Sequence, residues 1–142
     1  MAKHILKTDS KEVYDFMLFG IICQHHDYRL CFEMNRAINL SLERAADLEL
    51  TLNKGKDKIK TSRFEYKDGF GNEYFVLSNK TSNGLLIAEY KNIDYFFMVR
   101  EPAPVHDKLQ LEKKLRAIPV ILGAYHLEPE KIKTGERFIF WS

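Results

Sequence analysis

The sequence predicts an α+β fold in which a mainly antiparallel β-sheet packs against two principal helices. Three observations indicate this class: apolar runs of strand length separated by short polar turns, an apolar stripe at helical spacing over 27–40, and a second such stripe over 106–126. The chain has 142 residues, of which 45% are hydrophobic and 30% charged, and this is enough for one domain with a buried core. We therefore expect a single globular domain over 1–142.

The N-terminal part is expected to form two strands, over 3–8 and 13–23. The second run is apolar almost without interruption, as in a strand with both faces buried. A helix follows over 27–40, with Asp27 as its expected N-cap. Spacings of 1, 4, 7 and 8 residues place its apolar side chains on one side: Leu30, Cys31, Met34, Ala37 and Ile38. A further stripe either packs under a loop or meets a protein partner, and it consists of Tyr28, Phe32, Asn35 and Asn39.

The middle of the chain is expected to form strands joined by turns. Alternation of leucine with polar residues predicts a half-buried strand over 48–52. The sequence Asp-Gly-Phe-Gly-Asn at 68–72 has turn chemistry and separates two apolar runs, so 62–78 is expected to form a hairpin. The remaining expected elements of this part are a turn over 79–84 and strands over 85–87 and 94–100.

The last third allows two interpretations. Pro119 lies inside an apolar stripe, and a proline there must kink or end a helix because it lacks one amide donor. The alternative is a strand from Val120 to Leu127. We favour the helix over 106–126 because five stripe positions agree, namely Leu111, Leu115, Ile118, Leu122 and Tyr125. A closing strand is expected over 137–141.

Composition and terminal sequence indicate the compartment. The first seven residues carry charge and contain no apolar core of signal-peptide length. The longest apolar run, from Phe16 to Cys23, is far shorter than the roughly 20 residues that cross a bilayer. The two cysteines are too few for a disulfide framework and fit a reducing environment. We expect a cytoplasmic protein that makes no membrane contact.

Motifs for the commoner catalytic chemistries do not occur. The glycines at 69 and 71 have neither the phosphate-loop spacing nor a following lysine. The metal-like cluster of Cys23, His25, His26 and Cys31 lacks the paired spacing of zinc sites. We therefore expect no metal site, no cofactor and no catalytic residue, and we favour a protein that is not an enzyme.

The positive charge of the chain is concentrated in one stretch. Residues 51–67 contain six Lys/Arg and two Asp/Glu, a balance of +4, whereas the whole chain carries +2. In an extended conformation alternate lysines project from one side, which suits a nucleic-acid backbone. The residues expected to contact RNA are Lys54, Lys56, Lys58, Lys60 and Arg63. A solvated loop, or lysines that protect an edge strand, is the alternative.

The segment 87–95, Ile-Ala-Glu-Tyr-Lys-Asn-Ile-Asp-Tyr, resembles the signature of the bacterial IPExxxVDY family. The positions that match are Ile87, Glu89, Ile93, Asp94 and Tyr95, and Ala88 stands where the family has proline. The resemblance implies kinship without a reaction, because the family has no assigned activity. Its members tend to be encoded beside a double-stranded-RNA endonuclease, which implies a link to RNA metabolism by association.

These observations predict a non-enzymatic binding module that docks on a larger cytoplasmic RNA–protein assembly, with the ribosome as the first expectation. One alternative is a small-molecule-binding protein or enzyme with a carboxylate pocket near Glu89 and Asp94, where two acids close together could act as an acid/base pair. The purely structural interpretation of the same two acids is that Glu89 binds turn amides while Asp94 pairs with a lysine or arginine. The other alternative is an adaptor that binds protein through the stripe of Tyr28, Phe32, Asn35 and Asn39.

Overall fold

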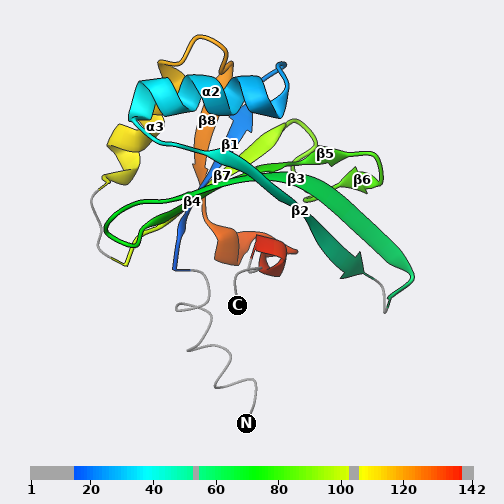
Figure 1. Ribbon diagram of the computed structural model, residues 1–142. Helices are drawn as coiled ribbons and strands as arrows, with labels where there is room; N and C mark the ends of the chain where they lie inside the picture. Colours follow the sequence, from blue (N-terminus) through cyan, green and yellow to red (C-terminus); the bar gives the residue numbers. More distant parts are fainter. Residues whose placement is uncertain (1–14, 53–54, 103–105, 139–142) are drawn as a thin grey trace.

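The structure is a computed structural model, and it describes residues 15–52, 55–102 and 106–138. Its centre is a six-stranded antiparallel sheet with strand order β2-β3-β4-β7-β1-β8 (Figure 1). A small hairpin of two further strands, β5 and β6, lies beside β3. The strands are β1 Met17–Ile22, β2 Glu43–Leu52, β3 Asp57–Lys67, β4 Glu73–Ser78, β5 Lys80–Thr81, β6 Gly84–Leu85, β7 Tyr95–Arg100 and β8 Gly123–Leu127.

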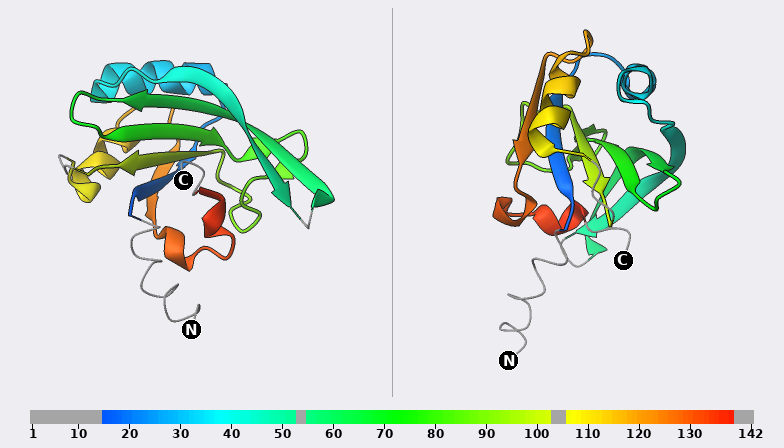
Figure 2. Two further views of the ribbon diagram at one scale, coloured as in Figure 1. Left: turned by 60° about the horizontal axis from the view of Figure 1, so that its bottom comes forward. Right: turned by 90° about the vertical axis from the view of Figure 1, so that its left-hand side faces the viewer.

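Different structures cover the two faces of the sheet. The helices α2 (Asp27–Ile38) and α3 (Lys108–Arg116) lie on one face, and the short 3-10 helices η2 (Pro129–Lys131) and η3 (Gly135–Phe138) lie on the other (Figures 1 and 2). The sheet therefore separates two apolar cores. The predicted α+β class, with a mainly antiparallel sheet and two principal helices, is confirmed.

The central strands are apolar on both sides because each faces both cores. In β7, Phe97 points to the helices while Phe96 and Met98 point to the C-terminal segment, and all three are fully buried. In β1, Phe19 and Leu18 divide in the same way. This arrangement explains the nearly continuous apolar run predicted for 13–23, of which the structure describes the part from Asp15 onward.

Helix α2 buries most of the predicted apolar face, but Ala37 is exposed and the helix begins differently from the prediction. Leu30, Cys31 and Met34 are buried against the sheet. The N-cap is His26, which makes no side-chain capping bond, so the expected cap at Asp27 is wrong by one position. Asp27 instead accepts the Tyr28 N–H at 2.7 Å. The carboxylate still lies in the first helical turn, where the positive end of the helix dipole favours it.

The predicted helix over 106–126 is correct only in its first half. Helix α3 ends at Arg116, three residues before Pro119, and Gly123–Leu127 forms the edge strand β8 paired with β1. The strand alternative for the end of this segment is therefore confirmed, and the favoured helix is wrong there. The physical reason is that the proline stops the helix and the open edge of β1 then supplies backbone partners.

The other expected strands differ in how well the structure matches them. The strand predicted over 137–141 is wrong where the structure describes it, since Arg137 and Phe138 belong to η3. The expected strand over 3–8 lies outside the described residues. The hairpin over 62–78 and the strand over 48–52 are confirmed as β3–β4 and part of β2, whereas in 85–87 only Leu85 is in a strand.

Helix α3 protects the free edge of β8. The His126 N–H donates to the Glu112 carboxylate at 2.7 Å, and the Arg116 guanidinium donates to the Ala124 carbonyl oxygen at 2.9 Å. Both bonds satisfy backbone groups that another strand could otherwise pair with. The edge of the sheet at β8 is thus closed by side chains, whereas the other edge is formed by β2.

Candidate functional site

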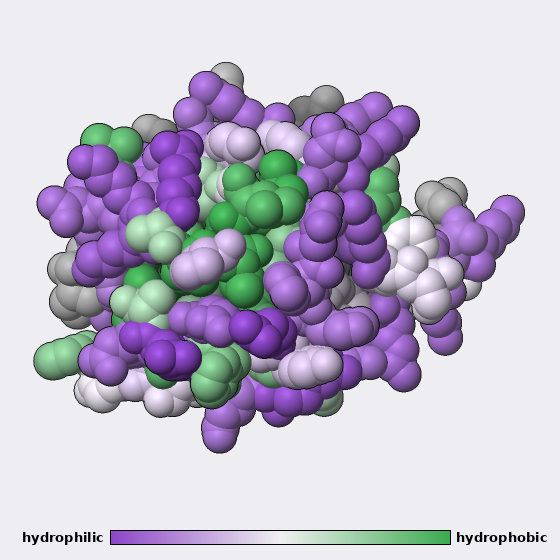
Figure 3. Space-filling view, turned by 90° about the horizontal axis from the view of Figure 1, so that it is seen from above, coloured by the Kyte–Doolittle hydropathy of each residue, from purple (hydrophilic) through white to green (hydrophobic). Residues whose placement is uncertain are grey.

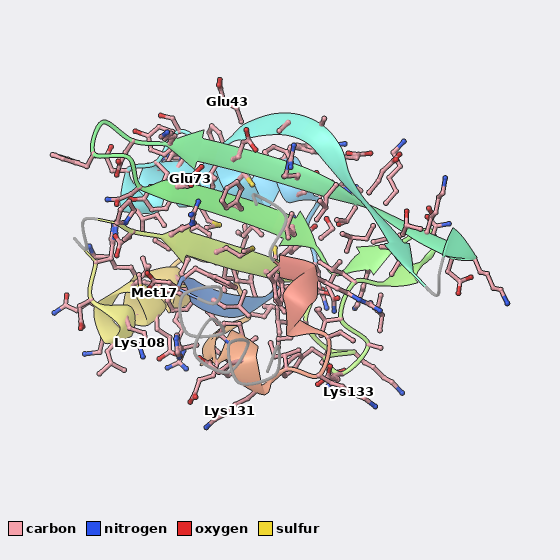
Figure 4. The ribbon with its side chains drawn as sticks, turned by 90° about the horizontal axis from the view of Figure 1, so that it is seen from below. Met17, Glu43, Glu73, Lys108, Lys131 and Lys133 are labelled. Atoms are coloured by element: carbon pink, nitrogen blue, oxygen red, sulfur yellow. The ribbon has the colours of Figure 1, made fainter. Side chains whose placement is uncertain are left out.

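Residues 55–61 of the lysine-rich stretch lie in the far end of a long hairpin that projects from the body of the molecule (Figures 1 and 4). We call its end, residues 48–52 of β2 and 55–61 up to the middle of β3, the basic arm. Lys56, Lys58 and Lys60 are all exposed there. Lys54, also predicted to contact RNA, lies outside the described residues. Three of the predicted contact residues are therefore placed together in solvent.

The strand register determines which lysines share a face. Lys58 is paired with Thr51 and Lys60 with Glu49, and these alternate with Ile59 and Thr61, which are buried on the opposite face. The Lys60 ammonium is 3.8 Å from the Glu49 carboxylate, and both side chains are more than half exposed. An ion pair so exposed is weak, because water screens it. Lys60 can therefore exchange Glu49 for an anionic ligand at little cost.

Arg63 does not belong to this surface. It lies on the same side of β3 as Thr61 by strand alternation, and its guanidinium is 3.5 Å from the Glu65 carboxylate. The predicted five-residue patch is thus divided by the pleat of the strand. A hollow of about 610 Å³ adjoins two of the remaining lysines, with Lys56, Lys58 and Asn83 among its lining residues. The side-chain amide of Asn83 adds hydrogen-bonding capacity for an anion.

The segment that resembles the family signature is a structural junction. Its first residue, Ile87, and Ile93 are buried in the core beneath the sheet. Between them, the chain is held by Asn79, whose side chain donates to the carbonyl oxygens of Tyr90 at 2.8 Å and Ile93 at 2.9 Å and accepts the Ile87 N–H at 2.8 Å. Asn79 is fully buried, so these bonds replace solvent entirely.

Sequence reasoning missed Asn79 because it counted this asparagine only as a turn residue. The one local signal was its place directly after an apolar strand, where an amide side chain can bond to the backbone nearby. Its three partners lie 8, 11 and 14 residues further along the chain. Such partners become visible only after the chain has folded back.

The two carboxylates of the signature bind different parts of the molecule. Glu89 accepts the N–H groups of Lys133 at 2.9 Å and Thr134 at 3.2 Å. Asp94 accepts the Cys23 N–H at 2.9 Å and pairs with the Lys80 ammonium at 2.8 Å. This is the arrangement that the structural interpretation predicted, with Glu89 on turn amides and Asp94 on a lysine.

Tyr95 adds a third tie, since its O–H donates to the His25 carbonyl oxygen at 2.6 Å. Burial raises the pKa of the Tyr95 hydroxyl well above its ordinary value, and the Asp27 carboxylate adds to the effect. The hydroxyl therefore stays protonated and remains a donor. Together, Glu89, Asp94 and Tyr95 join the signature to the C-terminal segment, β5 and the loop before α2.

Asp94 and Tyr95 also line an open depression of about 350 Å³, together with Cys23, His25 and His26, but Glu89 is not part of it. Burial raises the pKa of the Cys23 thiol, which disfavours the nucleophilic thiolate. Among the described residues, no group of three or more His, Cys, Asp or Glu side chains is placed to hold a metal ion. The depression thus offers polar contacts from Asp94, Tyr95 and the two histidines.

The stripe on α2 divides into two halves. Tyr28 and Phe32 are 63% and 54% exposed, respectively, so the aromatic half is open to a partner. Asn35 instead binds both backbone groups of Leu42, accepting its N–H at 2.8 Å and donating to its carbonyl oxygen at 3.2 Å. Asn39 ends the helix in the left-handed conformation, with φ of 57°. The two asparagines therefore act within the protein.

A scan of protein-family models found no match to the chain, and a search of curated proteins found no similar sequence. None of the helices in the part of the chain that the structure describes has the length and apolar character needed to cross a membrane.

Proposed function

We propose that this protein is a non-enzymatic binding module that docks on a cytoplasmic RNA–protein assembly, with the ribosome as the first candidate, and that the basic arm contacts RNA. The observation that carries the proposal is that Lys58 and Lys60 share one exposed face of a projecting strand, with Lys56 beside them. Because Cα atoms at alternate strand positions are about 7 Å apart, the two side chains start from separate points and present separate ammonium groups. They neutralise phosphates and position the partner without reading base sequence.

The geometry narrows the contact surface expected from the sequence. Arg63 is not included in the proposed contact surface, because its side chain faces away from Lys58 and pairs with Glu65. The surface proposed for RNA therefore consists of the lysines of the arm, with Asn83 at its margin. Binding through such a surface depends strongly on salt, because each neutralised phosphate releases counterions.

The test is the affinity for a fluorescein-labelled oligouridine, measured by fluorescence anisotropy at several salt concentrations. We expect the triple variant Lys56→Glu, Lys58→Glu, Lys60→Glu to bind about tenfold or more weakly, with a smaller salt slope. The matched control reverses three exposed lysines elsewhere and changes the net charge equally: Lys108→Glu, Lys113→Glu and Lys133→Glu. Figure 4 labels Lys108 and Lys133, which lie away from the tip of the arm.

Equal losses in the two triple variants would assign any RNA affinity to net charge alone and reject the arm as the site. If the unaltered protein does not bind oligouridine even at low salt, the arm is also rejected as an RNA site. The assembly itself is tested by sedimentation of the tagged protein in lysate of its host. Co-migration with ribosomal particles that is lost in the arm variant, and not in the control, is the expected result.

Kinship with the IPExxxVDY family is also a proposal. It is supported by the role of each matching position: Ile87 and Ile93 are buried, and the polar side chains of Glu89, Asp94 and Tyr95 all form hydrogen bonds across the fold. Under this proposal the signature preserves a fold and not a reaction.

The runner-up, a carboxylate pocket near Glu89 and Asp94, has less support, because the two acids have separate partners. An adaptor function is a second candidate, and the exposure of Tyr28 and Phe32 favours it.

A further inference from the structure

A groove lies between α2 and the end of α3, on the face of the sheet that these helices cover. It has a volume of about 480 Å³, and its lining includes Ala37 of α2 and the Ala117-Ile118-Pro119 turn after α3. Figure 3, which views this side, shows an apolar area surrounded by hydrophilic side chains. The early end of α3 creates the groove, because the chain turns away at Pro119 and small alanines line both sides. The groove therefore has an apolar floor that the protein itself leaves open.

Positive charge borders this floor. Arg36 and Lys114 line the groove from opposite helices, and neither forms an ion pair with any residue in the described ranges. The acid at the same border, Glu33, is already paired with Arg29 at 3.1 Å. The Arg36 guanidinium also lies 5.6 Å from the centre of the exposed Phe32 ring. The groove thus combines an apolar floor with two cations available to an anion, and Phe32 lies outside its lining.

We infer that this groove binds a short segment of a partner protein in which one or two apolar side chains are flanked by carboxylates. The apolar side chains would displace water from the exposed Ala37, Ala117 and Pro119, and the carboxylates would pair with Arg36 and Lys114. The volume lies within the range of sites that accommodate a few side chains. Aliphatic walls favour an aliphatic or aromatic anchor, whereas nucleic acid would leave its phosphates against an apolar floor.

This inference does not rest on RNA binding by the basic arm. Helix α3 and the tip of the arm lie at opposite ends of the molecule (Figure 1). A variant of one site therefore leaves the other intact, and failure of one proposal is distinguishable from failure of the other. Together the two sites would make the protein a bridge between RNA and a protein partner.

The first experiment selects ligands from a phage-displayed library of random dodecapeptides. The immobilised protein is used for selection, and the variant Ala37→Trp, Lys114→Glu is used for counter-selection. Trp at 37 fills the groove from an exposed helix position, so the core is not altered. We expect enriched peptides that combine Leu, Ile or Phe with Asp or Glu. Recovery of no peptide that distinguishes the two proteins, or of peptides without acidic residues, would overturn the inference.

The second experiment measures the affinity of one selected peptide by fluorescence anisotropy. Lys114→Glu should weaken binding about tenfold, because a favourable charge contact becomes repulsive. Its matched control is Lys113→Glu, which makes the same charge change one residue away and outside the groove lining, and should alter binding less than about twofold. Thermal unfolding monitored by circular dichroism verifies that both variants fold.

Competition identifies the chemical class of the occupant. An acidic peptide that lacks apolar residues should not displace the selected peptide, and oligouridine should not displace it either. Displacement by both at similar concentrations would show that the groove cations form part of a general polyanion surface. Equal effects of Lys113→Glu and Lys114→Glu would also reject a defined groove site.

Discussion

The signature segment and the basic arm both contain charged residues that the sequence singles out, but the structure uses the charges in opposite ways. In the signature, Asp94 is only 17% exposed and holds a backbone N–H and a lysine. In the arm, Lys60 is 58% exposed, and its acidic partner, Glu49, is 3.8 Å away. The difference lies in what each strand end meets: β7 begins inside the body of the molecule, whereas β3 begins beyond it (Figure 1).

This comparison teaches that charge pattern alone does not separate a structural role from a binding role. A charge that accepts hydrogen bonds from backbone N–H groups contributes to the free energy of folding. A charge on a projecting strand leaves its interactions available to a partner. We therefore expect substitutions in the signature junction to change stability, and substitutions of the arm lysines to change binding with little effect on stability.

Among the polar side chains, the largest effect is expected at the centre of the junction. Asn79→Ala removes three buried hydrogen bonds and leaves two carbonyl groups and one N–H without that partner, so we expect a loss of about 3 kcal/mol in the free energy of unfolding. Urea denaturation measures it. The matched control is Asn83→Ala, because Asn83 is exposed in the adjoining hairpin turn. A loss below about 0.5 kcal/mol at Asn79 would remove the junction from this account.

A smaller effect should separate the two contacts of Asp94. Asp94→Ala leaves the Cys23 N–H without its hydrogen-bond acceptor, and we expect the free energy of unfolding to fall by about 1–3 kcal/mol. Lys80→Ala removes only an ammonium that is 58% exposed, and we expect a loss of less than about 1 kcal/mol. Chemical denaturation of both variants and of the double variant gives the coupling free energy. Similar losses in the two single variants would mean that the ion pair, and not the N–H contact, matters more.

The smallest effect is expected at the exposed lysines of the arm. The double variant Lys58→Ala, Lys60→Ala should change the free energy of unfolding by less than about 0.5 kcal/mol, because both side chains are exposed. Ile59→Ala, between them but on the buried face, should cost about 2–4 kcal/mol. Thermal and urea unfolding compare the two variants directly. If the lysine variant is as unstable as the isoleucine variant, the lysines support the fold and the contrast between the regions is false.

Sequence patterns predicted the fold best where one short segment contains all the information. The apolar face of α2 and the β3–β4 turn are examples. In the turn, Asp68 accepts the N–H groups of Phe70 at 2.8 Å and Asn72 at 3.0 Å, within the same five residues that had turn chemistry. Desolvation opposes ionisation of Asp68, but these bonds and those from the Tyr74 and Asn72 side chains outweigh it and lower the pKa of the carboxyl group.

Prediction failed where two local patterns competed. The stripe that includes Leu122 and Tyr125 has helical spacing, yet both residues lie beyond the end of α3 and are exposed. Pro119 weakened the helix, and the free edge of β1 decided the outcome because it offered a ladder of backbone partners. No local count of apolar positions contains that edge.

The candidate sites show the same division. Alternation correctly placed Lys58 and Lys60 together, since side-chain direction follows from strand periodicity. The same periodicity places Arg63 on the other face, a parity that the predicted patch did not take into account. The groove at Ala37 and Ala117 could not be predicted, because one side comes from α2 and the other from the turn after α3, and no local pattern connects the two segments.

The sequence by itself determined the α+β class, the position of the first helix, most strands and the concentration of lysines, because periodicity, turn chemistry and charge are properties of neighbouring residues. Only the tertiary structure decided which charges are used inside the molecule. Asp94 finds its N–H partner 71 residues away at Cys23, and Glu89 finds one 45 residues away at Thr134. Hydrogen bonds act over about 3 Å, so the partner of a polar side chain is set by the packing that brings distant segments together.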